Sequence, residues 1–398
     1  MLFSVYQNPV RTVKKALFCL YRDRKLGYNA SERAGSDSRI VIKTTNKRKH
    51  AHRAREGEGM SSLQDVAKLA GVSKTLVSRT VNHQSGVSEK SRQKILAAMK
   101  ELNYKPNALA RSLVTRRTNT IGIVMDTLCE PYFFPLIEGL EEAADHTDYD
   151  LVVSSGRNSV EHKKNAVRYY SQGRADGLIL YGSRLEDREI IQGLSGQSFP
   201  FVAVENTFPA LDINNIVLDN AFGSGIAVDY LIQCGCRRIF HVGGDMRHQV
   251  SIDRQNGYIQ AMQRHGVTVD SRMLIPADFD VKGSCRIMQR YLRETPVSQL
   301  PEAFYCGSDN TAYGTIMALE ESGIHVPEDI MVIGFDDDMP PRQYQHRALT
   351  TLSQPLREMG RSAMEVLLAQ IRQPETPAQH IVYYPKLVVR ETTRNPVG

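Results

Sequence analysis

The chain has 398 residues, of which 41% are hydrophobic and 24% charged, a composition typical of a soluble protein with two or three domains. No run approaches the roughly 18 apolar residues of a membrane span. The six cysteines form no CxxC pair, which favours free thiols over a zinc site. The net charge of +6 conceals a gradient: residues 1–59 carry +9, residues 60–118 carry +8, and the remainder carries −11. A basic segment ahead of an acidic body indicates that a polyanion binds near one end.

Residues 1–59 lack any pattern that would bury a core, and we expect a disordered basic extension there. Residues 55–59, REGEG, can be encoded almost entirely by A and G. A purine-rich stretch before a Met codon resembles a bacterial ribosome-binding site. We therefore expect the native protein to start at Met60. The alternative is a genuine basic arm that adds non-specific affinity for DNA.

Helical patterning begins near Met60 and predicts a compact all-α headpiece over residues 60–105. A short helix is expected over residues 63–70, a second over 74–82 and a third after Ser88, its candidate N-cap. Ala67, Gly71 and Val77 have helix-turn-helix spacing. The small Ala67 allows a close helix crossing, Gly71 tolerates positive φ in the turn, and Val77 is buried against the first helix.

The opposite face of the second helix carries Lys74, Thr75, Ser78 and Arg79, all of which can form hydrogen bonds. Such a face can enter a major groove and contact base edges. An ordinary α-hairpin with a polar outer face would show the same spacing, so the spacing alone leaves that alternative open.

These residues also resemble the headpiece of the lactose/galactose-repressor family. The matching motifs are LQDVAKLAGVS at 63–73, VSR at 77–79, VS at 87–88, LNYKPN at 102–107 and ARSL at 110–113, and the resemblance continues to about residue 393. Leu76 and Thr80 depart from the family pattern, where Thr and Val are common. Leu76 removes a candidate phosphate contact, and Thr80 weakens the apolar side of the helix.

The resemblance implies a role for each DNA-binding position. Lys74 and Thr75 would discriminate bases, and Arg79 would contact a guanine. A hinge helix and linker would occupy residues 106–118, with Leu113 as a wedge in the minor groove at the centre of a palindrome. Leu113 could instead be an ordinary buried leucine. The remaining candidate DNA contacts, including phosphate contacts that set the register, are Ser62, Ser73, Ser78, Asn82, Asn107 and Arg111.

From residue 120 onward, β-rich runs alternate with helical segments, which predicts parallel α/β architecture. At least eight strands over roughly 270 residues suggest two sheets rather than one. Ligands bind at the carboxyl ends of the strands in such sheets. The strand ends are rich in carboxylates and hydroxyls, which suits a polyhydroxylated ligand: Asp126, Ser154, Tyr181, Glu205, Asp219, Asp245, Ser308, Asp309 and Asp336.

This region is similar to the family's effector domain, so residues 119–398 are expected to form a two-lobed, periplasmic-binding-protein-like body that binds effector and dimerises. Crossings between the lobes are expected near residues 205–211, near 338–351 and before a final strand at 381–389. Ser308 stands where relatives often have Asn. Phe133 and Phe279 are stacking rings or core residues, and Asp219 is a ligand contact or a structural carboxylate. The candidate effector site comprises Asp126, Phe133, Arg254, Phe279, Ser308, Asp309 and Asp336.

The predicted function is that of a cytoplasmic, sequence-specific transcription regulator. We expect a repressor of sugar-utilisation genes that binds a palindromic operator as a homodimer and responds to a sugar or sugar derivative. No cofactor, metal or membrane partner is expected. One alternative is a carbohydrate-active enzyme, but GxSxG, P-loop, GxGxxG and HExxH motifs are absent. The other is a periplasmic sugar receptor, which would need a cleavable signal in place of the basic headpiece.

Overall fold

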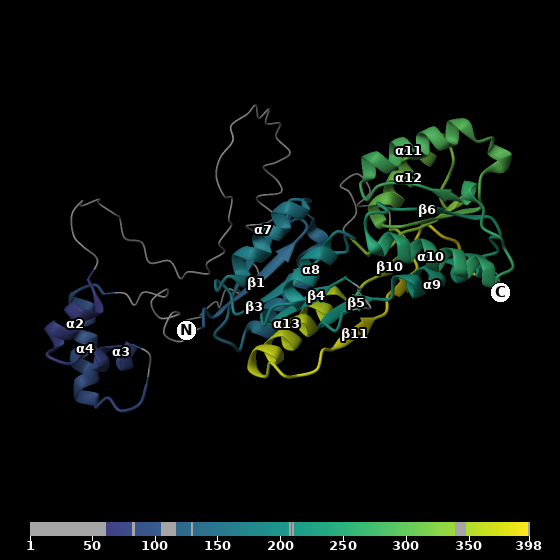
Figure 1. The fold of residues 1–398 in the computed structure, drawn as a ribbon. Coiled ribbons are helices and arrows are strands. Elements are labelled where there is room, and N and C mark those ends of the chain that lie inside the picture. The colour runs from purple at the N-terminus through teal and green to yellow at the C-terminus, as the bar shows by residue number, and fades with distance from the viewer. Residues whose placement is uncertain are drawn as a thin grey trace. The chain divides into compact units, whose positions relative to one another are not determined.

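The computed structural model describes residues 61–81, 84–104, 117–128, 130–206, 208, 211–338 and 348–396 (Figure 1). The chain divides into two compact units, one containing the headpiece helices and the other an α/β body that begins at Asn119. Most of the predicted hinge, residues 106–118, and all of residues 1–59 lie outside the described residues.

The described residues of the headpiece form three helices: α2 (Leu63–Ala70), α3 (Lys74–Val81) and α4 (Glu89–Glu101). Ser62 and Asp65 form a capping box that starts α2, and Gly71 ends it with φ 65°. Ser88 caps α4 by accepting from the Ser91 amide. These caps satisfy backbone groups that short helices otherwise leave exposed, so the predicted helix limits are confirmed at these positions.

The headpiece core is small and is built around Val66, Val77 and Ile95, whose side chains are fully buried. Thr80 is also buried, and its hydroxyl donates to the Leu76 carbonyl at 2.9 Å. A buried hydroxyl with a partner costs little, so Thr80 fits on the inner face of α3.

The first lobe of the body is a six-stranded parallel sheet (Figure 1). Its order is β11 (His380–Tyr383), β5 (Asn215–Leu218), β4 (Phe201–Val204), β3 (Gly177–Tyr181), β1 (Thr120–Met125) and β2 (Asp150–Ser155). Its helices are η1 (Pro131–Phe133), α6 (Phe134–Ala144), α7 (Val160–Ser171), α8 (Asp187–Ser195) and α13 (Leu356–Arg372). The helices α6 and α13 pack closely where each has a glycine. A Cβ on Gly139 or Gly360 would overlap the backbone of the other helix.

The second lobe is a four-stranded parallel sheet in the order β7 (Leu274–Ile275), β6 (Ile239–Val242), β8 (Ala303–Cys306) and β9 (Met331–Ile333). Its helices are α9 (Asn220–Gln233), α10 (Gln249–Arg264), η2 (Ser271–Met273), α11 (Val281–Glu294), η3 (Val297–Gln299) and α12 (Asp309–Glu321). The predicted two-lobed parallel α/β body is confirmed.

The chain passes from the first sheet to the second after Leu218, because β5 pairs with β4 and β11. The expected crossing near residues 205–211 is therefore wrong. The second crossing includes β10 (Thr351–Ser353), and the third lies between β11 and β12 (Lys386–Val388), which pairs antiparallel with β10. The predicted final strand at 381–389 is thus two strands. Within the described residues, no helix is long and apolar enough to cross a membrane.

Candidate DNA-binding face and effector cleft

Helix α3 has one exposed face that is polar and one buried face that contains Val77 and Thr80. Val77 faces the headpiece core, whereas Lys74, Thr75 and Arg79 are exposed. Ser78 is half-buried between the two faces. Two cations and a hydroxyl on one exposed helix face can meet phosphates and base edges of DNA.

The predicted phosphate contacts Ser62 and Ser73 both lie at helix N-termini. The Ser73 hydroxyl accepts from the Leu76 amide at 3.3 Å, and the Ser62 hydroxyl donates to the Asp65 carboxylate at 2.7 Å. Free backbone N–H groups at a helix start attract anions, which favours a phosphate at Ser73. At Ser62 the Asp65 carboxylate already accepts from both the hydroxyl and the amide. The remaining predicted DNA contacts lie outside the described residues: Asn82, Asn107, Arg111 and Leu113.

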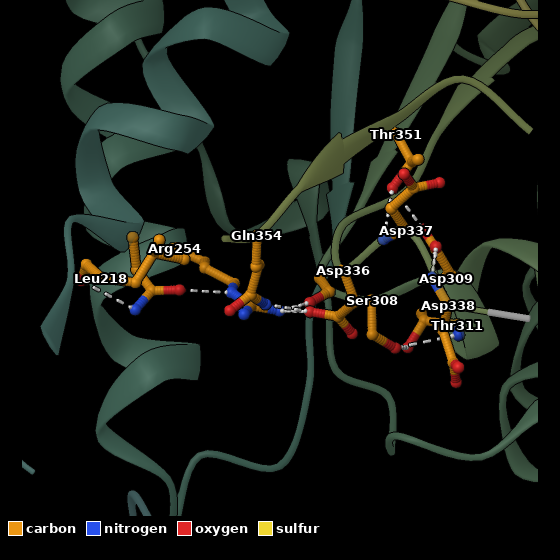
Figure 2. A network of polar contacts seen from close by, with 12 residues as sticks. Leu218, Arg254, Ser308, Asp309, Thr311, Asp336, Asp337, Asp338, Thr351 and Gln354 are labelled. Carbon is orange, nitrogen blue, oxygen red and sulfur yellow. Dashed lines mark hydrogen bonds and ion pairs between the residues drawn. The ribbon is translucent and has the colours of Figure 1, made fainter. Parts of the chain in front are cut away.

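Arg254 is the central cation between the two lobes (Figure 2). It comes from α10 and is only 3% exposed. Its Nε donates to Asn220 Oδ1 at 2.8 Å, and its Nη1 donates to the Gly307 carbonyl at 2.6 Å and lies 3.0 Å from Asp336 Oδ1. Its guanidinium carbon lies 3.7 Å from the centre of the Phe335 ring. These contacts hold the guanidinium in one orientation.

Asp336 follows β9 at the carboxyl end of the second sheet, as predicted. Its φ of 115° is unfavourable for a residue with a side chain. Gln354 Nε2 donates to the same carboxylate at 2.7 Å. Burial raises the pKa of Asp336, and Arg254 opposes that rise. A strained backbone held by a buried ion pair is typical of a binding site rather than of simple packing.

Ser308 caps helix α12, and Asp309 joins that helix to the crossing segment (Figure 2). The Ser308 hydroxyl accepts from the Thr311 amide at 3.1 Å. Asp309 accepts from the Thr351 hydroxyl at 2.6 Å and from the Asp338 amide at 2.8 Å. Burial raises the pKa of Asp309 well above its ordinary value. Both carboxylate oxygens thus already have protein donors.

The first lobe contributes Asp126 and an aromatic group to the cleft. Asp126, at the end of β1, accepts from the buried Lys163 ammonium at 2.9 Å. The buried Phe133 ring contacts the Tyr132 and Tyr181 rings edge-on, with centroids 5.1 Å and 5.0 Å apart. Burial raises the pKa of Tyr132. In the second lobe, the charge of Asp336 also raises this pKa, and that of Arg254 lowers it. Groups of the two lobes therefore lie close enough here to affect one another.

Phe279 belongs to the second lobe and is half-buried. Its ring lies over Gly244, where a Cβ would overlap it. The His248 ring meets the Phe279 ring edge-on at 5.7 Å. Phe279 thus remains a candidate stacking ring, whereas Phe133 is packed into the core of the first lobe.

Three polar residues outside the predicted set also lie in this network. Glu205 has φ 64°, accepts from the Leu218 amide at 3.0 Å, and burial raises its pKa to about 7. Asn220 and Gln354 hold Arg254 and Asp336. Glu205 was visible as a strand-end carboxylate, but Gln354 follows the unpredicted strand β10. Asp219 caps α9 by accepting from the Phe222 amide, so it is a structural carboxylate.

Among the described residues, no group of three or more His, Cys, Asp or Glu side chains could hold a metal ion. The acidic residues of the cleft are instead engaged by Arg254, Lys163, amides and hydroxyls.

A helix-turn-helix headpiece and a two-lobed sensor body define a ligand-responsive, DNA-binding transcription regulator. Residues 62–107 match the bacterial regulatory proteins of the lacI family, and residues 228–393 match the periplasmic binding protein-like domain. The HTH-type transcriptional repressor PurR of Erwinia tasmaniensis is 35% identical over 334 residues, covering 84% of this chain and 97% of that protein. The chain belongs to the lacI family and is a DNA-binding transcriptional repressor of that family.

Solved structures agree with this assignment. The lac repressor dimer bound to operator and the anti-inducer ONPF has a TM-score of 0.73 at 28% identity, covering 84% of this chain and 99% of that one. The complex of the regulator CelR with cellobiose has a TM-score of 0.62 at 27% identity, covering 83% and 99%. The family resemblance and the fold predicted from the sequence are confirmed.

Proposed function

We propose that the protein is a cytoplasmic repressor that binds a palindromic operator as a homodimer, and that an uncharged ring-shaped effector in the interlobe cleft controls this binding. Residues 60–105 are the DNA-binding headpiece, residues 106–118 the hinge, and residues 119–398 the effector-binding and dimerisation body. Residues 1–59 are a dispensable basic extension. We infer no catalytic role.

The observation that carries the DNA-binding part is the exposed face of α3. Lys74, Thr75 and Arg79 lie on this face, and Val77 on the opposite side of the helix packs into the headpiece core. Residues 60–118 carry +8, so phosphate contacts would supply affinity and the three side chains would supply sequence preference. The lac repressor structure, a dimer on its operator, supports the same arrangement here.

The chemistry of the cleft supports a ligand rich in hydroxyl or amine donors. Carboxyl groups outnumber cations here: Asp126, Glu205 and Asp309 are buried and Asp336 is half-buried, near Arg254 and Lys163. An added phosphate or carboxylate would lie beside these carboxyl groups in a poorly solvated site, at high cost. Neutral donors could share these carboxylates, and the Phe279 ring could cover an apolar ring face.

We propose a sugar or sugar derivative as the first ligand class. The CelR–cellobiose complex supports it, because that protein binds a sugar on the same fold. The second class is a planar heterocyclic base, since the curated relatives bear the name PurR and the cleft has aromatic rings on the first lobe as well as Phe279 on the second. Both classes are neutral, so neither would place an anion beside these carboxyl groups.

The test begins with selection of the operator from random DNA by the full-length protein. Fluorescence anisotropy then measures operator affinity with cellobiose, lactose, adenine, guanine and, as an anionic control, glucose 6-phosphate. We expect a palindromic consensus and a change with a neutral compound. A binding site without two-fold symmetry would contradict the dimer, and a response to glucose 6-phosphate alone would contradict the neutral ligand. Turnover of the added sugar would show an enzyme.

A further inference from the structure

The two lobes also meet at a point remote in sequence from the three chain crossings. The segment after β3 and the segment before α10 form an antiparallel bridge between Arg184 and His248. The Leu185 amide donates to the Arg247 carbonyl at 3.0 Å, and the Gln249 amide donates to the Ser183 carbonyl at 2.7 Å. Because β3 and β6 belong to different sheets, these bonds tie one lobe to the other.

A side-chain bond reinforces this bridge. Ser183 Oγ lies 3.0 Å from His248 Nδ1, with Ser183 8% exposed and the His248 side chain 15% exposed. The other side of the imidazole faces Phe279 edge-on. His248 therefore contacts both the bridge and the candidate stacking ring.

The first-lobe half of the bridge rests on a buried ammonium group. Lys163 donates to Asp126 at 2.9 Å and to Asp187 at 2.6 Å, and all three side chains are largely buried. Gly182 has φ 153°, and a Cβ there would overlap the Lys163 ammonium. The loop that carries Ser183 is thus held in place by the same lysine that binds Asp126, a candidate effector contact.

We propose that residues 183–185 and 247–249 form an interlobe latch, and that Ser183 and His248 are positioning residues that set how much of the free protein holds the cleft closed. The proposal rests on the effector cleft of the proposed function. When only a fraction of the free protein has the binding-competent, closed cleft, its apparent affinity for the ligand is reduced by that fraction. Losing the Ser183–His248 bond should lower the closed population relative to the open one by about two- to ten-fold.

Hydrogen–deuterium exchange on the full-length protein without effector tests the latch directly. The Leu185 and Gln249 amides should exchange slowly in the parent, and about two- to ten-fold faster in Ser183→Ala and His248→Ala. Core amides of both sheets, such as those of Ile123 and Tyr305, should not change. Ser183→Thr retains the hydroxyl and should restore slow exchange. The matched control combines Ser195→Ala and His162→Ala, which remove an exposed serine hydroxyl and an exposed imidazole.

Equal exchange of both amides in the parent, the two alanine variants and the control would overturn the latch. Faster exchange throughout the first lobe would also overturn it, because a folding defect would then explain the change. Titrations with cellobiose and adenine form the second arm, in which the latch variants should bind the active compound more weakly. If neither compound binds, the proposed effector classes fail while the exchange data still decide the latch.

Discussion

Replacing Arg254 with Met would test whether the buried ion pair organises the cleft. Methionine preserves much of the apolar contact with Phe335 but removes every donor of the guanidinium. Asp336 would keep Gln354 as a donor and lose its cation. The Gly307 carbonyl and Asn220 Oδ1 would lose the donors they have from Arg254.

The expected cost follows from the burial of this network. Removing one partner of a buried ion pair costs about 3–5 kcal/mol, because the remaining charge is left without compensation. Asp336→Asn is the matched milder change, since an amide oxygen can still accept from Arg254 and Gln354. Arg254 would lose its carboxylate but keep every hydrogen-bond acceptor, so this change should cost less, about 1–3 kcal/mol. Residues in one network are not additive, so the double variant should lose less than the sum of the two single losses.

Urea unfolding followed by far-UV circular dichroism measures these losses, since the chain contains no tryptophan. Operator affinity without effector should be retained in both single variants, whereas the response to effector should disappear. The reasoning is refuted if Arg254→Met costs no more than Asp336→Asn, or if the double variant loses the full sum. Retained effector affinity in both variants would show that the cleft is wrongly placed.

Three further predictions concern the headpiece and the body. Exchanging Lys74 and Thr75 for other residues should alter the selected half-site and cost about 1–3 kcal/mol at the affected base pair; an unchanged consensus would contradict their proposed role. Gly71→Ala should destabilise the headpiece by about 1–2 kcal/mol through its positive φ alone, since no atom lies near the added Cβ. Gly193→Ala, in equally open space within α8, should be neutral or stabilising in the same urea assay; equal effects at both glycines would refute the backbone argument. Burial lowers the pKa of His241 to about 4, and the ring stacks on Tyr258 and Tyr305. The unfolded chain therefore takes up this proton first, so stability present above pH 6.5 should fall by about 3 kcal/mol as the pH approaches 4. His241→Phe should flatten that decline in urea titrations, and an unchanged pH profile would contradict it.

The sequence by itself determined the local structure of the protein. Caps and turns at Ser62, Gly71 and Ser88 depend on neighbours within a few residues, so both ends of the first headpiece helix and the start of the third could be predicted. The polar face of α3 followed from helical periodicity. The alternation of β-rich and helical runs predicted two parallel sheets, because each run carries its own hydrophobic pattern.

Contacts between distant segments were decided only by the tertiary structure. Strand β5 joins the first sheet through pairing with β11, more than 150 residues away, so the true crossing could not be found locally. Asp336 was predicted as a strand-end carboxylate and Arg254 from the family resemblance, but Asn220 and Gln354 complete their network from separate elements. Ser183 meets His248 between the two lobes for the same reason. The local sequence pattern indicates which residues are buried. Which buried or polar groups contact one another depends on how distant segments pack, and only the tertiary structure shows this.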